Sequence, residues 1–426
     1  MPNWTRRDFI KATSASLALG FAGAPFIASG AARKARVVVI GGGFGGAIAA
    51  KYIKQLDPQI EVTLIERNKN YVSCPFSNEV LSGERDISTL TFGYQGLAAR
   101  GINVIHDEAT AIDPVKKTVS IRNGKALEYD RLVVSPGIQF DWKAIEGCSP
   151  EMEKTMPHAW KAGENTLLLR KQLEAMKDGG TAIIVVPPAP IRCPPGPYER
   201  AAQMCAYFTH HKPKSKVLIL DANDMMSKRP LFEQAWATLY PGMVTWTPKS
   251  NFGKVVRVDQ KTRNLVTEFD NYTSEVINFI PPHKAGPIAH IAGLTNEAGW
   301  CPVDPVTMES TKHKGIHVIG DASLAGDMPK SAHSAGSQAK ATAAAIVAMI
   351  NGQPAPMPYY VNTCYSLVSP DWGFSVAGLY KAEGAKIAAI PGSVVISPTN
   401  VAPFTRKEEA AFGLSWLANI TAEAFS

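Results

Sequence analysis

The chain has 426 residues, of which 45% are hydrophobic and 19% charged, and its formal net charge is +7. This length predicts two to three domains with ordinary buried cores, and the composition excludes an intrinsically disordered chain. Because no run or stripe of Lys and Arg accompanies the mild positive charge, we expect no nucleic-acid partner.

The first 31 residues are typical of an export signal. Residues 5–11 read TRRDFIK, a twin-arginine pattern, and an apolar stretch over residues 15–27 follows. Small residues at 28–31 then offer a cleavage site. The apolar stretch is shorter than the roughly 20 residues that a membrane span needs, and we expect no transmembrane segment later in the chain. We therefore expect a periplasmic protein exported by the twin-arginine pathway, in a compartment where disulfides persist.

Residues 37–66 predict a strand, a glycine-rich turn, a helix and a second strand that ends on an acid. In this pattern Gly41 permits the tight turn, Gly43 lets a pyrophosphate approach the backbone, and Gly46 lets helix and strand pack closely. Glu66 follows at the distance from which a carboxylate bonds the adenosine ribose. The segment therefore predicts a Rossmann-like dinucleotide site, with the pyrophosphate at the helix N-terminus.

Two later segments indicate which dinucleotide is bound. Residues 129–137 (YDRLVVSPG) predict an apolar strand running into a Pro-Gly turn, and residues 317–322 (HVIGDA) predict a strand ending on Asp321. Together with the glycine motif, they resemble the FAD-containing pyridine nucleotide-disulfide oxidoreductase superfamily over roughly residues 33–350. The resemblance implies that the cofactor is FAD and that Asp321 bonds its ribityl chain.

A second Rossmann-like unit begins with the apolar strand at residues 181–186 (TAIIVV). The glycine loop that should follow is replaced by the proline-rich segment Pro187–Pro197. Proline lacks the N–H group that cradles a phosphate, and its ring blocks close approach. The next strand, residues 216–220, keeps the architecture. We therefore predict that the fold of this unit survives and that binding of NAD(P)H is lost.

Three short motifs carry cysteines. Cys193 stands in the proline-rich turn, six residues before Glu199. Cys364 lies in NTCYS (362–366), and Cys74 lies in SCP (73–75). With these motifs the chain is similar to the flavoprotein subunit of flavocytochrome c sulfide dehydrogenase, a family related to sulfide:quinone oxidoreductases. Further matching segments are residues 299–304 and 328–331, so the resemblance covers nearly the whole mature chain.

The resemblance implies roles for these cysteines. Cys193 and Cys364 would form a redox-active disulfide over the flavin ring, and Cys74 would carry FAD through a thioether to its 8α-methyl group. From the residues alone, a structural disulfide and an inert buried Cys74 stay open, because exported proteins contain such bonds and free cysteines are commonly buried. Cys205 falls inside a helical pattern over residues 199–210, and we expect it in the core.

Two charged residues are candidates beside the flavin. Glu199 is expected to manage protons at the disulfide, although an acid is also favourable at the start of any helix. Lys330 and the N-terminus of a helix beginning near Ser334 are expected to stabilise negative charge on reduced flavin. A surface lysine is the alternative for Lys330.

The resemblance implies oxidation of sulfide to sulfur or polysulfide. Sulfide would attack one cysteine of the disulfide, form a persulfide and release the other cysteine as a thiolate. No C-x-x-C-H occurs in the chain, so we expect no haem on it and a separate c-type cytochrome subunit, in a heterodimer, as electron acceptor. Two alternatives stay open: a sulfide:quinone oxidoreductase, and a non-catalytic flavoprotein partner of a sulfur-oxidation complex.

The expected fold class is α/β, with two Rossmann-like domains of the glutathione-reductase type and a C-terminal α+β domain. The tail from residue 404 is expected to form a short helix that packs on the domain or a partner, with Phe412, Leu414, Trp416, Leu417 and Ile420 on one face. The expected boundaries are 1–31 for the signal, 32–155 with 270–350 for the FAD domain, 156–270 for the second nucleotide domain and 351–426 for the C-terminal domain.

Overall fold

A computed structural model describes residues 34–426, and residues 35–426 form one compact unit. The expected export signal, residues 1–31, lies outside the described residues. None of the helices within residues 34–426 combines the length and the apolar character that a membrane crossing requires.

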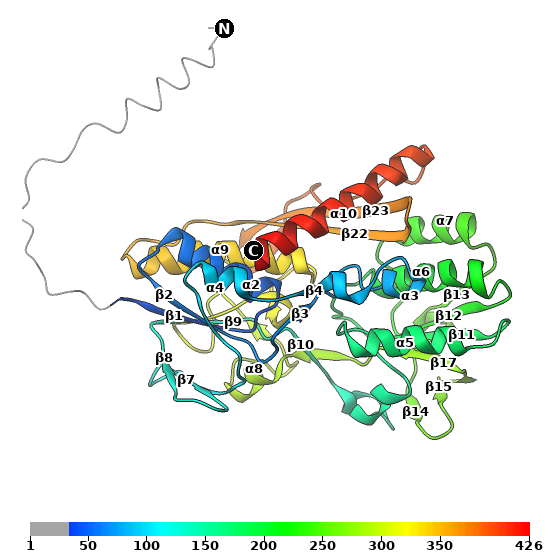
Figure 1. Ribbon diagram of the computed structural model, residues 1–426, viewed down its shortest axis with the longest axis horizontal. Helices are drawn as coiled ribbons and strands as arrows, with labels where there is room; N and C mark the ends of the chain where they lie inside the picture. Colours follow the sequence, from blue (N-terminus) through cyan, green and yellow to red (C-terminus); the bar gives the residue numbers. More distant parts are fainter. Residues whose placement is uncertain (1–33) are drawn as a thin grey trace, which may run out of the picture. The chain divides into compact units, whose positions relative to one another are not determined.

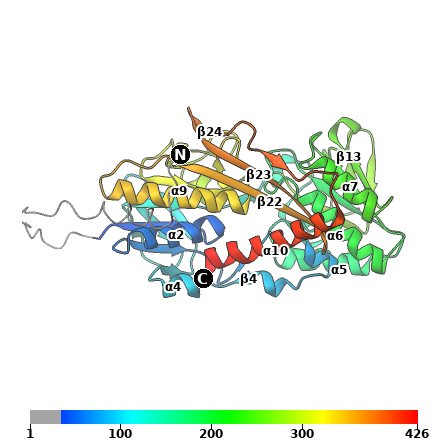
Figure 2. The same ribbon diagram turned by 90° about the horizontal axis from the view of Figure 1, so that it is seen from above.

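The first sheet is parallel and brings together strands from both expected segments of the FAD domain. Its central strand is a buried β-branched run, as expected for a sheet that is covered on both faces. Helices α2 (Phe44–Leu56) and α9 (Ala332–Ile350) lie side by side against it (Figure 1; Figure 2). The strand order is β20 (Ile316–Val318), β9 (Arg131–Val134), β1 (Arg36–Ile40), β2 (Glu61–Ile65), β5 (Asn103–Ile105).

The second sheet is also parallel and forms the second Rossmann-like unit. Helices α5 (Glu164–Ala175), α6 (Gly196–His211) and α7 (Arg229–Leu239) accompany it (Figure 1). The strand order is β13 (Val244–Thr247), β12 (Lys216–Asp221), β11 (Thr181–Val186), β17 (Val276–Phe279).

Strand β17 corrects the expected domain boundary at residue 270. It pairs in parallel with β11, so the second unit continues to at least residue 279 before the chain returns to the first sheet. The boundary was misplaced because a short apolar strand carries no mark of which sheet it will join. Only pairing across the fold assigns it.

The C-terminal region is an antiparallel sheet covered by one long helix. Strand β22 packs against α9 of the first unit and against α6 of the second, so it connects the two. Its partners are β23 and, on β23, both β24 and β25. The bounds are β22 (Tyr359–Ser369), β23 (Trp372–Glu383), β24 (Lys386–Ala389), β25 (Val395–Ile396) and α10 (Pro403–Phe425).

Helix α10 is longer than the short helix expected for the tail, and its buried face differs from the expected one. Leu417 and Ile420 are buried as expected, whereas Phe412 and Leu414 are 57% and 42% exposed. The buried face instead follows residues spaced three and four apart, including Ala410 and Gly413, because the sheet beneath α10 requires small side chains there.

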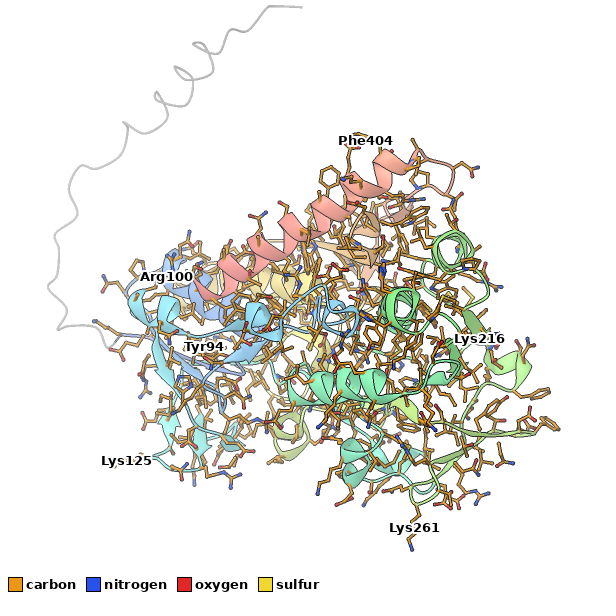
Figure 3. The ribbon with its side chains drawn as sticks, turned by 45° about the vertical axis from the view of Figure 1, so that its right-hand side comes forward. Tyr94, Arg100, Lys125, Lys216, Lys261 and Phe404 are labelled. Carbon is orange, nitrogen blue, oxygen red and sulfur yellow. The ribbon has the colours of Figure 1, made fainter. Side chains whose placement is uncertain are left out.

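The far end of α10 is anchored on the first unit. In Figure 3 the helix runs from the labelled Phe404 toward the labelled Arg100, whose Nε donates a 3.0 Å hydrogen bond to the carbonyl oxygen of Ser426. Phe425, in the last turn, stacks on Tyr71 and Phe92. The C-terminal region therefore packs on both nucleotide units.

Smaller elements complete the described chain. The antiparallel pair β10 (Ile138–Phe140) and β18 (His283–Ala285) lies where the chain passes between the two units. The others are β3 (Tyr71–Val72), α3 (Glu79–Ser82), β4 (Thr91–Phe92), α4 (Gln95–Ala99), β6 (Ala109–Asp113), β7 (Thr118–Ile121), β8 (Leu127–Glu128), β14 (Arg257–Asp259), β15 (Asn264–Val266), β16 (Asn271–Thr273), α8 (Pro287–Ile291), β19 (Cys301–Pro302) and β21 (Ser323–Leu324), with short 3-10 turns between them.

Candidate active site

A cavity of about 800 Å³ opens where the carboxyl ends of β1, β9 and β20 meet. Gly41 and Gly46 allow the backbone beside this cavity to pack closely, and of the two only Gly41 lines the cavity. Gly41 has φ +96°, and a Cβ there would lie 2.2 Å from the carbonyl oxygen of Ser135. A Cβ at Gly46 would lie 1.8 Å from the carbonyl oxygen of Gly41, so helix α2 approaches the turn only because glycine is present. The predicted cofactor residues that line the cavity are Gly41, Gly43, Glu66, Cys74 and Asp321.

The walls of this cavity fit a flavin dinucleotide. A Cβ added at Gly43 would meet only the ring of Tyr71, at 3.5 Å, so an added side chain would occupy the cavity and not the core. Oδ1 of Asp321 is buried without a hydrogen-bond partner among the described residues, and burial raises the pKa of this carboxyl group. A buried carboxylate oxygen requires a donor. A ribityl hydroxyl group would supply one at the place predicted for it.

Glu66 has a second task besides the one predicted for it. Its Oε2 accepts a 2.8 Å hydrogen bond from the amide of Gly42, and its Oε1 accepts a 2.9 Å bond from the amide of Asn68. The carboxylate therefore holds the glycine turn in shape. It also lines the cavity, where the remaining acceptor sites of a carboxylate stay open to a ribose. The ribose contact stays a prediction.

Lys330 is not among the residues that line the cavity, and its predicted effect on reduced flavin stays a prediction. Its Nζ donates to the carbonyl oxygens of Asp321 (2.7 Å) and Ser323 (2.8 Å) and lies 3.9 Å from the centroid of the Trp300 ring. Burial lowers the pKa of this ammonium group to about 8. Lys330 is thus neither a surface lysine nor a wall of the cavity; it holds the segment that presents Asp321.

Four other cations line the cavity and were not found from the sequence: Arg67, Arg122, Lys161 and Arg192. Burial lowers the pKa of Lys161. Arg192 interacts electrostatically with Cys74 and with Asp321. The only signal in the sequence was that Arg192 directly precedes Cys193. The sequence motifs gave Arg192 no role.

A smaller pocket of about 100 Å³ adjoins this cavity, and Cys74 and Arg192 line both. Cys193 and Cys364 meet here, one from the proline-rich loop and the other from β22. Cys193 and Cys364 lie close enough for each side chain to shift the pKa of the other, and both are free thiols in this structure. The fold therefore brings the two cysteines to one pocket, and the disulfide between them stays a prediction. Aromatic side chains complete the wall: Phe76, Trp160, Tyr365 and Trp416.

The backbone around the cysteine pair is unusual. Cys193 has φ +55°, and two other residues lining the pocket, Phe76 and Ala159, have φ +65° and +45°. Non-glycine residues in this region carry strain and are found preferentially at functional sites. The conformation of Cys193 is held in part by its amide, which donates a 2.8 Å hydrogen bond to the carbonyl oxygen of Lys330.

The two sulfurs differ in acidity. The hydrogen bond from Cys193, and then the positive charge of Lys228, lower the pKa of Cys364 to about 6. The pKa of Cys193 is raised, first by its interaction with Cys364 and then by burial. Burial also raises the pKa of Glu199 to about 7, although its Oε1 accepts a 3.1 Å hydrogen bond from Asn78. The site therefore has a thiolate-forming cysteine and a carboxyl group that titrates near neutral pH, as a proton acceptor needs.

Lys228 is a further residue that sequence reasoning missed. It directly precedes α7, and its Nζ donates to the carbonyl oxygen of Cys364 (3.0 Å) and to Oγ of Ser366 (2.7 Å). Nothing in the local sequence distinguishes it from other lysines, because its partners lie in β22.

The start of α6 is closed in the way the proline-rich loop predicts. A Cβ at Gly196, the first residue of the helix, would lie 2.7 Å from the Trp160 ring and 3.1 Å from the sulfur of Cys193. The helix end that would receive phosphates in a nucleotide-binding unit is therefore packed against the cysteine loop. Cys205, on the same helix, is fully buried as expected.

Three family models match the chain. The model described as sulfide dehydrogenase [flavocytochrome c] flavoprotein chain, central, matches residues 166–281. The model described as flavocytochrome c sulphide dehydrogenase, flavin-binding, matches residues 356–425. The model described as pyridine nucleotide-disulphide oxidoreductase matches residues 35–173.

Relatives agree with these models. Over 45 residues the chain is 64% identical to the sulfide dehydrogenase [flavocytochrome c] flavoprotein chain of Chlorobaculum thiosulfatiphilum, a match that covers 94% of that sequence and 11% of this chain. Over 302 residues it is 23% identical to the mitochondrial sulfide:quinone oxidoreductase of Mus musculus, which covers 67% of this chain and 65% of the mouse protein. The match thus spans less than two thirds of that relative.

A solved structure shows the same fold. The sulfide:quinone oxidoreductase from the hyperthermophilic bacterium Aquifex aeolicus superposes with a TM-score of 0.71 at 19% identity, over 91% of this chain and 92% of that chain. At this identity the likeness establishes the α/β fold with Rossmann-like domains. From the family models and the high identity to the Chlorobaculum sequence, the chain belongs to the flavoprotein family of flavocytochrome c sulfide dehydrogenase, within the pyridine nucleotide-disulfide oxidoreductases.

Proposed function

We propose that this protein is a periplasmic flavoprotein that oxidises sulfide to sulfur or polysulfide and passes the electrons through FAD to a c-type cytochrome subunit. One observation carries the proposal. Cys193 and Cys364 line one pocket, and this pocket shares Cys74 with the dinucleotide cavity. A thiol pair beside a flavin site is the arrangement that a disulfide-dependent flavoenzyme requires.

The residues of the pocket can carry out the first chemical step on sulfide. In the oxidised pair, hydrosulfide forms a bond to one cysteine sulfur, the Cys193–Cys364 bond breaks, and its electron pair leaves on the other sulfur as a thiolate. Glu199 accepts the proton of the incoming sulfide, since burial places its pKa at about 7. The aromatic wall excludes water from the new persulfide. A second hydrosulfide then takes the outer sulfur of the persulfide as a hydrodisulfide, the shortest polysulfide, and leaves both cysteines reduced. Bound FAD would supply the acceptor for the two electrons that are released when the disulfide reforms.

The chain would hold FAD through the cavity residues described above, and through a covalent bond to Cys74. Support for the tether comes from the position of Cys74, whose Sγ donates to the carbonyl oxygen of Trp160 at 3.5 Å and which lines both cavities. Acid precipitation should leave the yellow colour with the wild-type protein and release it from Cys74→Ser. Colour released wholly from the wild type would contradict the tether.

Electrons must leave by a route other than a pyridine nucleotide. The proline-rich loop and the closed start of α6 argue against a second nucleotide site, and the sequence contains no haem-attachment motif. A cytochrome subunit as acceptor agrees with the relative from Chlorobaculum, whose name describes the flavoprotein chain of a flavocytochrome. Export by the twin-arginine pathway would place the protein with such a partner.

A single spectroscopic experiment tests the function. Purified flavin-loaded protein is mixed with sulfide, first alone and then with oxidised cytochrome c. We expect flavin bleaching in the first case and continuous reduction of the haem in the second. If sulfide does not bleach the intact flavin, the proposed sulfide-oxidising activity is contradicted. That result would favour a non-catalytic flavoprotein partner of a sulfur-oxidation complex.

A sulfide:quinone oxidoreductase is the second candidate. The outer face of α10 exposes Phe404 (67%), Phe412 (57%) and Leu414 (42%), which a quinone-bearing membrane surface could cover. Sulfide turnover with a quinone in a membrane fraction, without turnover with cytochrome c, would favour this candidate. Co-purification of a haem subunit would exclude it.

A further inference from the structure

We propose that Lys228 is a positioning residue of the cysteine pair: it anchors the β22 segment that carries Cys364 and directs the negative charge of the reduced pair onto that sulfur. The proposal deepens the proposed function and rests on it for the role of the pair. No motif or comparison assigned a role to this lysine.

Lys228 is held in place by geometry that a surface lysine does not show. It is only 5% exposed, and its backbone adopts φ +59°. Its Nζ contacts β22 at two points, the carbonyl oxygen of Cys364 and Oγ of Ser366. The ammonium group also lies 5.3 Å from the ring centroid of Phe374 and 5.9 Å from that of Phe232. The side chain therefore joins the start of α7 to the strand that presents the cysteine.

A buried ammonium group is costly unless a negative charge lies nearby. The charged and titratable groups that face Lys228 are Cys364, Glu199, Cys193 and Glu409. Glu409 is already paired with Arg406, whose Nη1 donates at 2.9 Å. Glu199 accepts hydrogen bonds from Asn78 and from Ser366. Of these groups Cys364 has the largest effect on the pKa of Lys228, and Glu199 has the next largest.

The effect on the chemistry follows from charge balance. Two-electron reduction of the disulfide gives two thiolates, and the pKa of each sulfur decides which of them takes up a proton at a given pH. The pKa of Cys364 is lowered and that of Cys193 is raised, so Cys364 is the sulfur that loses its proton first. The charge of Lys228 lowers the pKa of both sulfurs, and its Nζ contacts the backbone of Cys364, so we place its larger effect on that sulfur. It acts through the Cys364 backbone and through space, so it is not itself a catalytic residue.

Thiol reactivity tests the proposal without sulfide turnover. The flavin-loaded protein is reduced with dithiothreitol and alkylated with iodoacetamide between about pH 5 and pH 9, and peptide mass spectrometry separates Cys364 from Cys193. In the wild type we expect Cys364 to react first, with a midpoint near its pKa of about 6. Lys228→Gln keeps a donor for the Cys364 carbonyl and removes the charge. It should slow alkylation of Cys364 at acidic pH by about tenfold or more, which corresponds to a midpoint about one unit higher.

Three further variants separate charge from packing. Lys228→Arg retains the charge and should keep the low midpoint. Ser366→Ala removes one anchor of the ammonium group and should raise the midpoint by less than Lys228→Gln does. Lys212→Met removes a lysine that also bonds backbone carbonyls, those of Glu174 and Met176, and should leave the midpoint unchanged. If the role of Lys228 were only structural, its variants would have lower melting temperatures, but their alkylation midpoints would not follow this order.

Folded, flavin-loaded Lys228→Gln or Ser366→Ala with the wild-type midpoint would overturn the proposal. If sulfide turnover is absent and the midpoints shift as expected, the proposed function fails and the role of Lys228 in charge placement stands. If turnover is normal and the midpoints do not move, only the inference about Lys228 fails.

Discussion

The two parallel sheets begin alike and differ at the first loop. In both units a buried apolar strand, β1 or β11, leads through a loop into a helix, α2 or α6. The first loop is made of glycine and opens onto the dinucleotide cavity at Gly43. The second is made of proline and presents Cys193 at φ +55° against the start of its helix.

The difference shows that strand pairing and loop chemistry are separable. Both sheets keep their parallel register, so the fold tolerates either loop. What changes is the group delivered at the helix start: free amide groups and space for phosphates in one unit, a sulfur beside a flavin site in the other. The predictions below test this comparison, from the largest expected effect to the smallest.

Removing either sulfur should have the largest effect. Cys193→Ser and Cys364→Ser should lose sulfide-dependent flavin reduction by several orders of magnitude, because no electrophilic sulfur remains, yet both should keep bound FAD. Stopped-flow bleaching of the flavin measures this. Cys148→Ser is the control, since Cys148 lies half-buried away from both pockets. Wild-type rates in either serine variant would show that the pair is structural.

A larger side chain in the glycine loop should reduce the amount of bound flavin. A side chain at Gly43 points into the cavity, so Gly43→Val should fold and yet carry less than half of the wild-type flavin per protein, read from the absorbance ratio. The matched change in the second loop, Pro188→Ala, lies at an exposed residue and should leave the flavin content unchanged. Equal flavin loss in both variants would remove the functional distinction between the loops.

The proton acceptor should show in the pH profile. Because burial raises the pKa of Glu199 to about 7, its ionised form grows as pH rises through neutrality, and turnover should grow with it. Glu199→Gln should lower the rate by about 10²-fold at pH 8 and by less at pH 6, as expected for loss of a general base. The ratio of the two profiles cancels the ionisation of sulfide itself. A ratio that does not change with pH would assign Glu199 to structure alone.

The smallest effect is expected from pyridine nucleotides. NADH should cause no saturable reduction of the flavin, because the proline-rich loop offers neither the amide groups nor the space for its phosphates. Anaerobic titration with NADH, monitored by flavin absorbance, checks this. Saturable reduction at a rate comparable with that of sulfide would mean that the second Rossmann-like unit still binds a pyridine nucleotide.

The two nucleotide loops and the buried helix position could be predicted from the sequence, because they depend on local backbone requirements. A glycine turn between a strand and a helix, a proline run in the equivalent place, and an apolar position such as Cys205 on a helix each carry their meaning within a few residues. The meeting of Cys193 with Cys364 followed only from a family resemblance, since nothing in the spacing of the two residues requires it.

Sequence alone therefore determined the order of the elements, the type of each nucleotide loop and the candidate cysteines. Tertiary structure decided the rest: that β17 belongs to the second sheet, that Phe412 and Leu414 face outward, that Lys330 bonds carbonyls, and that Lys228 reaches Cys364 across 136 residues. The physical reason is the same in each case. A buried charge or an apolar strand acquires its role from partners distant in the chain, and only the folded packing brings those partners within a hydrogen bond's length.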